Sequence, residues 1–399
     1  MSTRSRANHG KKGLIRHRTG RVAIAVTALA QCALLTGFAG PPRSATELRA
    51  AAGTAASGAP SPQSGVTTPR EGDATVANYK FRDGETIDQL KLHYTLLGEP
   101  HKNQKGVVDN AILLLHWTGA SSKALLTPEF QQSLFTPGAP FDVTRYLVII
   151  PDAIGHGQSS KPSDGLRSRF PHYGYGDMVD LQHKLVTETL GISHLRAVVG
   201  MSMGCMNAWQ WAEAYPSAMD GIMPVACFPA PISGRNLLWR KIIVDQIKSD
   251  PTWNGGNYQQ QPPAAAAAAS IARMMIDGVS HLQEEVTTPG QADKFIQAVK
   301  AQSSGGDAND LIYSLEASQD FNGEPHLGNI TAKVYAVNFA DDEFYRDSLG
   351  ILQRGMTKVQ HGRYVVRPTT DDSAGHLSMT HPALWKDKAQ TFTKWLNAN

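Results

Sequence analysis

Short apolar runs alternate with amphipathic stretches along most of the chain. Four continuous apolar runs stand out, at Ala111–Leu115, Tyr146–Ile150, Ala197–Val199 and Gly221–Cys227, and the mainly apolar stretch Lys333–Phe339 predicts a further strand. Runs of this kind are typical of strands that are buried on both faces of a parallel sheet. Helical periodicity appears between them, most clearly at Asp177–Leu190, and again near the end at Leu384–Leu396. The alternation predicts an α/β fold, with a mostly parallel sheet and helices on both faces.

The alternation is interrupted between residues 231 and 330. Helical patterns dominate there, at Asn236–Lys248, Ala264–Met275 and Gln291–Lys300, and no buried strand is evident in the sequence. Pro263 suits the first position of a helix, where a backbone N–H has no acceptor within the helix. We expect residues 231–330 to form a helical lid, inserted between the two parts of a core at residues 78–230 and 331–399.

The first 77 residues differ in composition from the rest. Seven lysines and arginines and no acidic residue lie within residues 1–21, and residues 22–40 are an almost uninterrupted apolar run. This arrangement predicts that residues 1–40 are a secretory signal peptide, with an uncleaved N-terminal membrane anchor as the alternative. Residues 41–77 are rich in Ala, Gly, Pro, Ser and Thr and contain no aromatic residue, which predicts a flexible linker. We therefore expect an exported protein, periplasmic or secreted.

Folded structure is expected from about Asn78 onward. Tyr79–Phe81 and Leu90–Leu96 predict two strands, joined by a turn at Asp83-Gly84. The net charge of +3 is small for 399 residues, and much of the positive charge lies in the N-terminal segment, so no nucleic-acid surface is predicted. Membrane contact is expected only through residues 22–40.

The cysteines and glycines exclude several classes of site. Cys32, Cys205 and Cys227 make neither a disulfide framework nor a metal-ligand spacing. The chain has no G-x-G-x-x-G motif of a dinucleotide site and no cluster of histidines and cysteines. The sequence therefore predicts no metal and no cofactor.

Gly200-Met201-Ser202-Met203-Gly204 lies between the apolar run at 197–199 and a helical pattern at Met206–Ala214. A strand, a sharp G-x-S-x-G turn and a helix form the nucleophile elbow of α/β-hydrolases. Glycines are needed where the strand and the helix approach each other closely. The motif predicts Ser202 as a nucleophile and the N–H of Met203, at a helix N-terminus, as a donor to an oxyanion. A tight turn around a buried structural serine is the alternative.

A second donor to the oxyanion is expected from the loop after an earlier strand. His116-Trp117-Thr118-Gly119 directly follows the run at Ala111–Leu115. In hydrolases with this elbow, the corresponding loop supplies the second backbone N–H of the oxyanion hole. Trp117 is the expected donor, and Thr118 is the alternative.

A nucleophilic serine needs an imidazole to accept its proton and a carboxylate to orient that imidazole. His376 follows the last predicted strand, at Val365-Val366, and is the expected base. Asp341 and Asp342 follow the strand at Lys333–Phe339, and the residues alone do not choose between them. The resulting chain order, Ser, Asp and then His, is the one found in α/β-hydrolases.

Two other histidines could be considered as the base. His156 lies in a glycine-rich loop and precedes the nucleophile in the chain, whereas the base of this class comes last, so a structural role is expected. His381 precedes Pro382 and is expected to begin the final helix, which makes it a weaker alternative to His376.

Several segments resemble the homoserine O-acetyltransferase family of α/β-hydrolases over about residues 78–399. They are Phe81–Gly84, Leu92–Gly98, His116–Gly119, Phe170-Pro171, Gly200–Gly204, Arg235–Ile243 and Asp250–Tyr258. The family's acid lies one residue before a bulky pair in a stretch similar to Asn338–Tyr345, so the resemblance implies Asp342 rather than Asp341. It also implies that Arg240 binds the carboxylate of the substrate.

Two positions depart from the family pattern. Cys205 stands where the family has a second glycine after the elbow, and Leu377 stands where it has an acidic residue after the catalytic histidine. That acidic residue helps to bind the ammonium group of homoserine, and a buried ammonium group without a partner is strongly disfavoured. An exported enzyme would also lack a supply of acetyl-CoA.

We therefore expect a serine hydrolase that cleaves small carboxylic esters through an acyl-enzyme. Transfer of an acyl group to a hydroxyl acceptor is the alternative, and a non-catalytic binding protein on the same scaffold is a third reading. The expected partner is a small acyl ester, without nucleic acid, and formation of a homodimer is left open.

Overall fold

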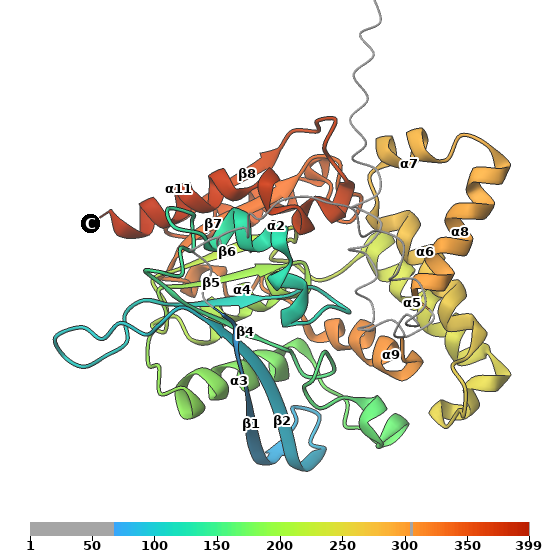
Figure 1. The fold of residues 1–399 in the computed structure, drawn as a ribbon, viewed down its shortest axis with the longest axis horizontal. Coiled ribbons are helices and arrows are strands. Elements are labelled where there is room, and N and C mark those ends of the chain that lie inside the picture. Colours follow the sequence, from blue (N-terminus) through green and yellow to red (C-terminus); the bar gives the residue numbers. More distant parts are fainter. Residues whose placement is uncertain (1–67, 304–305, 399) are drawn as a thin grey trace, which may run out of the picture.

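The computed structural model describes residues 68–303 and 306–398, which contain an eight-stranded sheet (Figure 1). The strand order is β1-β2-β4-β3-β5-β6-β7-β8. The strands are β1 (Arg70–Lys80), β2 (Thr86–Leu97), β3 (Ala111–Leu115), β4 (Leu147–Pro151), β5 (Ala197–Met201), β6 (Gly221–Val225), β7 (Lys333–Phe339) and β8 (Gly362–Arg367). The pairs β1–β2 and β2–β4 are antiparallel and the other pairs are parallel. The predicted mostly parallel α/β sheet is confirmed.

The central strands are buried on both faces, as their apolar runs predicted. Every residue of β3, β4, β5 and β6 is buried. Because side chains alternate along a strand, Leu113 and Val198 pack on one face of the sheet, while Ile112 and Val199 pack on the other. Neighbouring strands are in register there, with Leu113 beside Val198.

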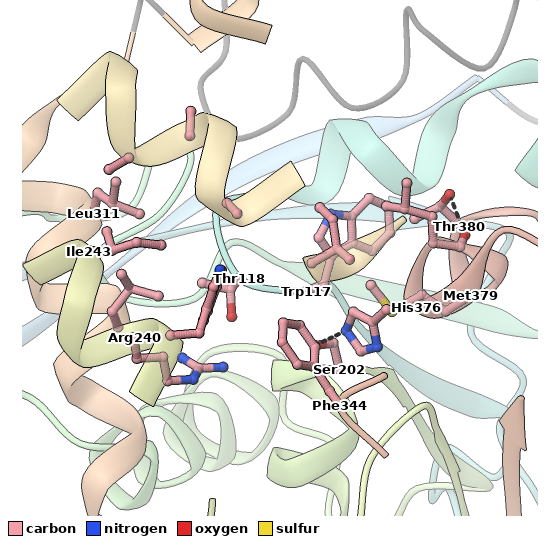
Figure 2. A pocket seen from close by; sticks show the side chains of 17 residues that line it. Trp117, Thr118, Ser202, Arg240, Ile243, Leu311, Phe344, His376, Met379 and Thr380 are labelled. Atoms are coloured by element: carbon pink, nitrogen blue, oxygen red, sulfur yellow. Dashed lines mark hydrogen bonds between the residues drawn. The ribbon is translucent and has the colours of Figure 1, made fainter. Parts of the chain in front are cut away.

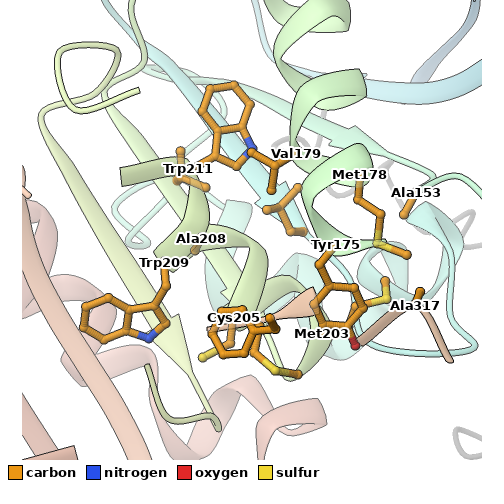
Figure 3. Close-up of a cluster of buried hydrophobic side chains, with 14 of the residues drawn as sticks. Ala153, Tyr175, Met178, Val179, Met203, Cys205, Ala208, Trp209, Trp211 and Ala317 are labelled. Carbon is orange, nitrogen blue, oxygen red and sulfur yellow. The ribbon is translucent and has the colours of Figure 1, made fainter. Parts of the chain in front are cut away.

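Helices cover both faces of the sheet. On one face lie α3 (Tyr175–Lys184), α4 (Met203–Ala214) and α10 (Ile351–Met356), and on the other lie α2 (Pro128–Phe130) and α11 (Lys386–Asn397). Figure 3 shows the side chains of α3 and α4 gathered in one buried cluster. Within this cluster Trp211 donates its indole N–H to Gln182 at 2.8 Å, so its polar atom is satisfied although the ring is buried.

Between β6 and β7, the described residues form helices and contain no strand. They are α5 (Gly234–Ser249), α6 (Pro263–Ile276), α7 (Val279–Glu285), α8 (Pro289–Ser303) and α9 (Ala308–Glu316). These yellow and orange helices lie together beyond one end of the sheet (Figure 1). The range expected to form a helical lid, 231–330, is therefore helical, and α6 begins at Pro263 as predicted. We refer to these helices as the lid, and their function as a lid remains a prediction.

The first strand begins earlier than the sequence suggested. β1 starts at Arg70, so the expected linker at 41–77 overlaps eight residues of the sheet, and Asn78 is not the start of folded structure. The error has a physical reason, because β1 is an edge strand in which only Ala74 and Tyr79 are fully buried. Its pairing with β2 runs along nearly its whole length and requires no apolar run.

The N-terminal predictions lie outside the described residues. The expected signal peptide or anchor at 1–40, including the run at 22–40, falls in the part of the chain that is not described. Among the residues that are described, none of the helices combines the length and the apolar character needed to cross a membrane.

Cys205 and Cys227 form a disulfide, although the three cysteines in the sequence predicted no disulfide framework. Their Cα atoms are 6.0 Å apart, and 22 positions separate them in the sequence. Their spacing carries no signal, because the pairing depends on how α4 packs beside the end of β6. Neighbouring strands β5 and β6 bring the two segments together.

Candidate active site

The predicted elbow places Ser202 in a strained turn between β5 and α4. The backbone of Ser202 has φ 50° and ψ −106°, a combination that few residues other than glycine adopt. A Cβ atom on Gly200 would lie 2.0 Å from the carbonyl oxygen of Gly204, and one on Gly204 would lie 2.5 Å from that of Leu115. Both positions therefore require glycine, and the turn lifts the serine to the end of the sheet.

Ser202, His376 and Asp342 form a continuous hydrogen-bonded line. The Oγ atom of Ser202 lies 2.9 Å from Nε2 of His376, and Nδ1 of His376 lies 2.7 Å from Oδ2 of Asp342. All three side chains are buried. The second oxygen of Asp342 accepts backbone N–H groups from Phe344 at 2.8 Å and from Tyr345 at 3.3 Å. These hydrogen bonds occupy both oxygens of the carboxylate and fix its orientation.

Asp341 has a different set of contacts from its neighbour. Its Oδ2 atom accepts the backbone N–H of Gly375 at 2.6 Å, and no contact with the ring of His376 is found among the described residues. The geometry therefore agrees with the family resemblance, which implied Asp342 as the partner of the histidine. Asp341 instead holds the backbone of the turn that carries His376.

The two predicted oxyanion donors lie on segments that are bonded to each other. Met203 is the first residue of α4, so its N–H belongs to a helical turn whose N–H groups have no acceptor inside the helix. The N–H of Gly204 donates to the carbonyl of His116 at 3.1 Å, which brings the start of α4 against the loop that contains Trp117.

His116 holds this loop in place, a role that the sequence reading missed. Its Nε2 accepts the N–H of Ala153 at 3.1 Å, so Nδ1 carries the proton and donates to the carbonyl of Trp117 at 2.8 Å. Burial lowers the pKa of His116, which keeps the ring neutral and both bonds intact. Its position next to Trp117 was the only available signal of this role.

A pocket of about 80 Å³ opens above Ser202 (Figure 2). Core residues line one side and lid residues line the other: Trp117, Thr118, Ser202, Phe344, His376, Leu377, Met379 and Thr380 from the core, and Trp239, Arg240, Ile243, Ala268, Ala269, Ala272, Ile276, Leu311 and Leu315 from the lid. Most of these side chains are apolar. An enclosed apolar cavity of about 150 Å³ holds a benzene ring, so this volume suits small groups.

Leu377 lines the pocket directly beside His376 and is almost fully buried. Phe344 and Tyr345 pack against the histidine ring, with centroid distances of 5.1 and 5.6 Å. The sequence reading did not assign a role to these two aromatic residues. They are the bulky pair noted after Asp342 in the sequence, and their packing fixes the position of the imidazole ring.

Arg240 is the buried cation of the pocket. Its Nε donates to Asn236 at 3.0 Å, and its guanidinium lies 5.5 Å from the centroid of the Trp239 ring. The Nη1 atom is buried and has no hydrogen-bond partner among the described residues. No carboxylate within residues 68–303 and 306–398 forms an ion pair with this side chain. A buried cation without a counter-charge is costly, so the site favours an anionic group from a ligand.

Two hydroxyls lie near this cation. Tyr345 is connected to it through Asn236, which donates to the Tyr345 oxygen at 3.3 Å. The hydroxyl of Tyr175 is buried near Thr118 and Arg240, and among the described residues it makes no hydrogen bond of normal length and angle. Burial raises the pKa of both tyrosines, so their hydroxyls stay neutral and can donate to an anion.

The remaining candidates lie elsewhere or have other roles. Burial lowers the pKa of His156 to about 3, and its Nδ1 donates to the carbonyl of Ile154 at 3.0 Å, in agreement with a structural role. His381 lies 3.4 Å from Glu129 rather than beside Ser202. Thr118 lines the pocket, and its hydroxyl is buried without a partner among the described residues.

Comparisons with known proteins agree with this geometry. The sequence profile of the alpha/beta hydrolase fold matches residues 110–350, which is more than half of the chain. A homoserine O-acetyltransferase from Leptospira biflexa is 29% identical over 316 residues, covering 75% of this chain and 79% of that protein.

Solved structures show the same fold. An acetylester hydrolase from Corynebacterium glutamicum superposes with a TM-score of 0.70 at 20% identity, covering 82% of this chain and 96% of that one. A homoserine O-acetyltransferase from Bacillus anthracis gives a TM-score of 0.70 at 21% identity, covering 83% and 98%. The chain belongs to the α/β-hydrolase family, and within it is similar to homoserine O-acyltransferases.

Proposed function

We propose that the protein is a serine hydrolase that cleaves small carboxylic esters through an acyl-enzyme. One observation carries the proposal: the hydroxyl of Ser202 is bonded to His376 at the floor of a small, mainly apolar pocket whose wall beside the histidine is Leu377. A nucleophile with a bonded base and an oriented carboxylate is the arrangement that acyl transfer requires.

The proposed reaction has two halves. In the first, Ser202 Oγ attacks the ester carbonyl while its proton passes to Nε2 of His376, and Asp342 stabilises the imidazolium that forms. The N–H groups of Trp117 and Met203 stabilise the negative charge on the carbonyl oxygen. The carbon–oxygen bond to the alcohol then breaks, and His376 gives its proton to the leaving alcohol.

In the second half, a water molecule attacks the acyl-enzyme. His376 takes one proton from this water, the bond between the acyl carbon and Ser202 breaks, and the proton returns to Oγ. The products are a carboxylic acid and the free serine. Water reaches the site as readily as any alcohol, so hydrolysis prevails unless the pocket binds an acceptor specifically.

Leu377 is the main argument against transfer to homoserine. An amino-acid acceptor brings a carboxylate and an ammonium group, and Arg240 can pair only with the carboxylate. Among the described residues that line the pocket, no carboxylate is available to the ammonium group. Binding such an acceptor would leave a charge unpaired in an apolar site.

Acyl transfer to a hydroxyl acceptor is the second candidate. The buried and unpaired Nη1 of Arg240 favours it, because this atom suits the carboxylate of an acceptor or of an ester. The similarity to homoserine O-acetyltransferases points in the same direction.

Product analysis separates the two candidates. The purified protein is incubated with p-nitrophenyl acetate or with acetyl-CoA, each with and without homoserine, and the products are identified by mass spectrometry. We expect acetate from the ester, with no saturable dependence on homoserine, and no activity in Ser202→Ala. Formation of O-acetylhomoserine from acetyl-CoA faster than ester hydrolysis would establish the transferase instead.

We also propose that the protein is exported. The basic and then apolar N-terminal segment supports this, and so does the Cys205–Cys227 disulfide, because structural disulfides are characteristic of oxidising compartments. N-terminal sequencing of the protein from its native host is expected to give a start near residue 40. Material that begins at residue 1 or 2 in the cytoplasm, with both cysteines reduced, would contradict the proposal.

A further inference from the structure

A disulfide joins the helix that carries the nucleophile to the segment after the next strand. Cys205 is the third residue of α4, and Cys227 lies two residues beyond the end of β6. Both are fully buried, and Cys205 lies two residues after Met203 on α4 (Figure 3).

Two backbone positions beside this crosslink are strained. Ser202 has φ 50°, and Ala226 has φ 61°, although neither is glycine. Residues with a side chain avoid this region of φ, and they remain there only where the surrounding structure leaves them no alternative. Ser202 lies three residues before Cys205, and Ala226 lies one residue before Cys227. Each cysteine of the disulfide therefore has one strained residue close to it in the chain.

A hydrogen bond joins the same two segments, because the N–H of Ser202 donates to the carbonyl of Val225 at 3.0 Å. The N–H of Ala226 donates to the carbonyl of Val337 in β7 at 2.8 Å, which fixes the second segment to the sheet. The disulfide is thus a second connection between segments 202–205 and 225–227. The hydrogen bond and the disulfide close a small ring that contains both strained residues. A closed ring limits how far either residue can relax toward an ordinary backbone conformation.

The segment that carries Cys227 is also connected to the base, through an aromatic residue that packs on the histidine ring. Phe228 packs edge-on against Tyr345 at 5.2 Å, and the ring of Tyr345 lies 5.6 Å from that of His376. The crosslink therefore joins the nucleophile's helix to a segment that supports the histidine. A small shift of one against the other would change the distance between Ser202 Oγ and His376 Nε2.

We propose that the Cys205–Cys227 disulfide is a positioning element of the active site, which holds Ser202 and the N–H of Met203 in the geometry of reaction. This inference rests on the proposed role of Ser202 as the nucleophile. The sulfur atoms touch neither substrate nor proton. Because the disulfide acts on the backbone that carries Ser202, its loss should lower kcat and leave substrate binding nearly unchanged.

The test is a double-mutant cycle on ester hydrolysis with Cys205→Ala, Cys227→Ala and the double variant. Rates are expressed per active site, counted by fluorophosphonate labelling, and measured well below each melting temperature. Displacements of about 1 Å can cost roughly 100-fold in rate, so we expect kcat to fall about 10- to 100-fold with KM nearly unchanged. Either single change breaks the crosslink, so all three variants should lose the same factor.

The outcomes distinguish this inference from the proposed function. Failure of the probe to label Ser202 in the wild-type protein would refute the function itself. Labelling of Ser202 together with wild-type kcat in all variants, and only a lower melting temperature, would make the disulfide merely stabilising. Losses that add in the double variant would assign the effect to side-chain packing.

Partial reduction provides a second measurement that does not depend on folding of the variants. Wild-type protein is exposed to a reductant under native conditions, and free thiols are counted by alkylation and mass spectrometry. We expect kcat to fall in proportion to the reduced fraction, while the labelled active sites remain constant. Full kcat in fully reduced, folded protein would overturn the inference.

Discussion

Asp341 accepts the backbone N–H of Gly375 at 2.6 Å. Gly375 directly precedes His376, whose ring is hydrogen-bonded to Asp342. Two adjacent carboxylates therefore act on the same turn, one on its backbone and one on its side chain. Gly375 has φ 61°, and a Cβ atom there would lie 2.8 Å from the backbone of Asp277 in the lid. The turn is thus bound by the segment that follows β7 and lies directly against the backbone of the lid at Asp277.

The two carboxylates should respond differently to amide substitution. Asp342→Asn removes the charge that stabilises the imidazolium and can impose the wrong tautomer, so kcat should fall by about 10⁴-fold. Asp341→Asn retains an oxygen that can accept the Gly375 N–H, so its kcat should stay within about tenfold of wild type. Steady-state kinetics of both variants provide the comparison. A larger loss in Asp341→Asn would move the role of the acid to that residue.

Leu377→Asp should shift the reaction toward homoserine. The new carboxylate would lie beside His376 and could pair with the ammonium group, while Arg240 binds the carboxylate. One charged contact in a desolvated site is worth about 2–5 kcal/mol, so the ratio of O-acetylhomoserine to acetate should rise at least about tenfold. Leu377→Asn, which has a similar shape but no charge, is the matched control. An equal change in both variants would show that charge is not the cause.

Arg240 should select esters that carry a carboxylate. Arg240→Met should lower kcat/KM for an acetyl ester of a hydroxy acid by about 10- to 150-fold, the value of a hydrogen bond to a charged group. The methyl ester of the same compound should be affected much less. Lys241→Met serves as the control, because Lys241 is an exposed cation on the same helix. Equal losses for both substrates would assign Arg240 a structural role only.

A chain of charged residues lies where the lid contacts the histidine turn. Asp277 is buried between Arg273, whose Nη2 is 2.8 Å away, and His281, whose Nδ1 is 2.9 Å away. Glu285 lies 3.8 Å from the other nitrogen of His281. The hydrogen bond with Asp277 raises the pKa of His281 above its ordinary value of 6.5, although burial acts in the opposite direction.

The stability of the lid should therefore depend on pH. A histidine whose pKa is raised by folding stabilises the folded state fully below pH 6.5, and this contribution is lost as pH rises through the raised pKa. The melting temperature of wild type minus that of His281→Gln should accordingly decrease as pH rises from 6.5 through the raised pKa of His281. His361→Gln, at an exposed site, is the control. A difference that stays constant from about pH 5.5 to about pH 9 would contradict this linkage.

Much of the fold followed from the sequence because the central strands are apolar throughout. The runs at β3, β5 and β7 could be recognised without any knowledge of their neighbours. β1 could not, because a polar edge strand is defined by its pairing with β2 rather than by burial. The start of α4 was placed at Met206 instead of Met203, because the strained elbow passes directly into the helix.

The part of the site that depends on local motifs and chain order could be predicted from the sequence. The elbow identified Ser202 from five residues, and chain order indicated His376. Residue chemistry alone did not choose between Asp341 and Asp342, and only the family resemblance favoured Asp342. The difference between the two carboxylates arises in a turn in which the N–H of Asp342 donates to the carbonyl of Phe339 at 3.2 Å. The disulfide and the role of His116 depend on contacts between segments that are distant in the chain, which only the tertiary structure supplies.

The most direct test of the central claim is to trap the acyl-enzyme. Wild-type protein is mixed with p-nitrophenyl acetate, quenched in acid within the first turnovers and digested, and the acetylated peptide is sequenced by mass spectrometry. We predict acetylation at Ser202, formed and lost at rates that match turnover, and no adduct in Ser202→Ala. An acetyl group on another residue that forms and decays at the turnover rate, or ester hydrolysis by Ser202→Ala at the wild-type rate, would contradict the account.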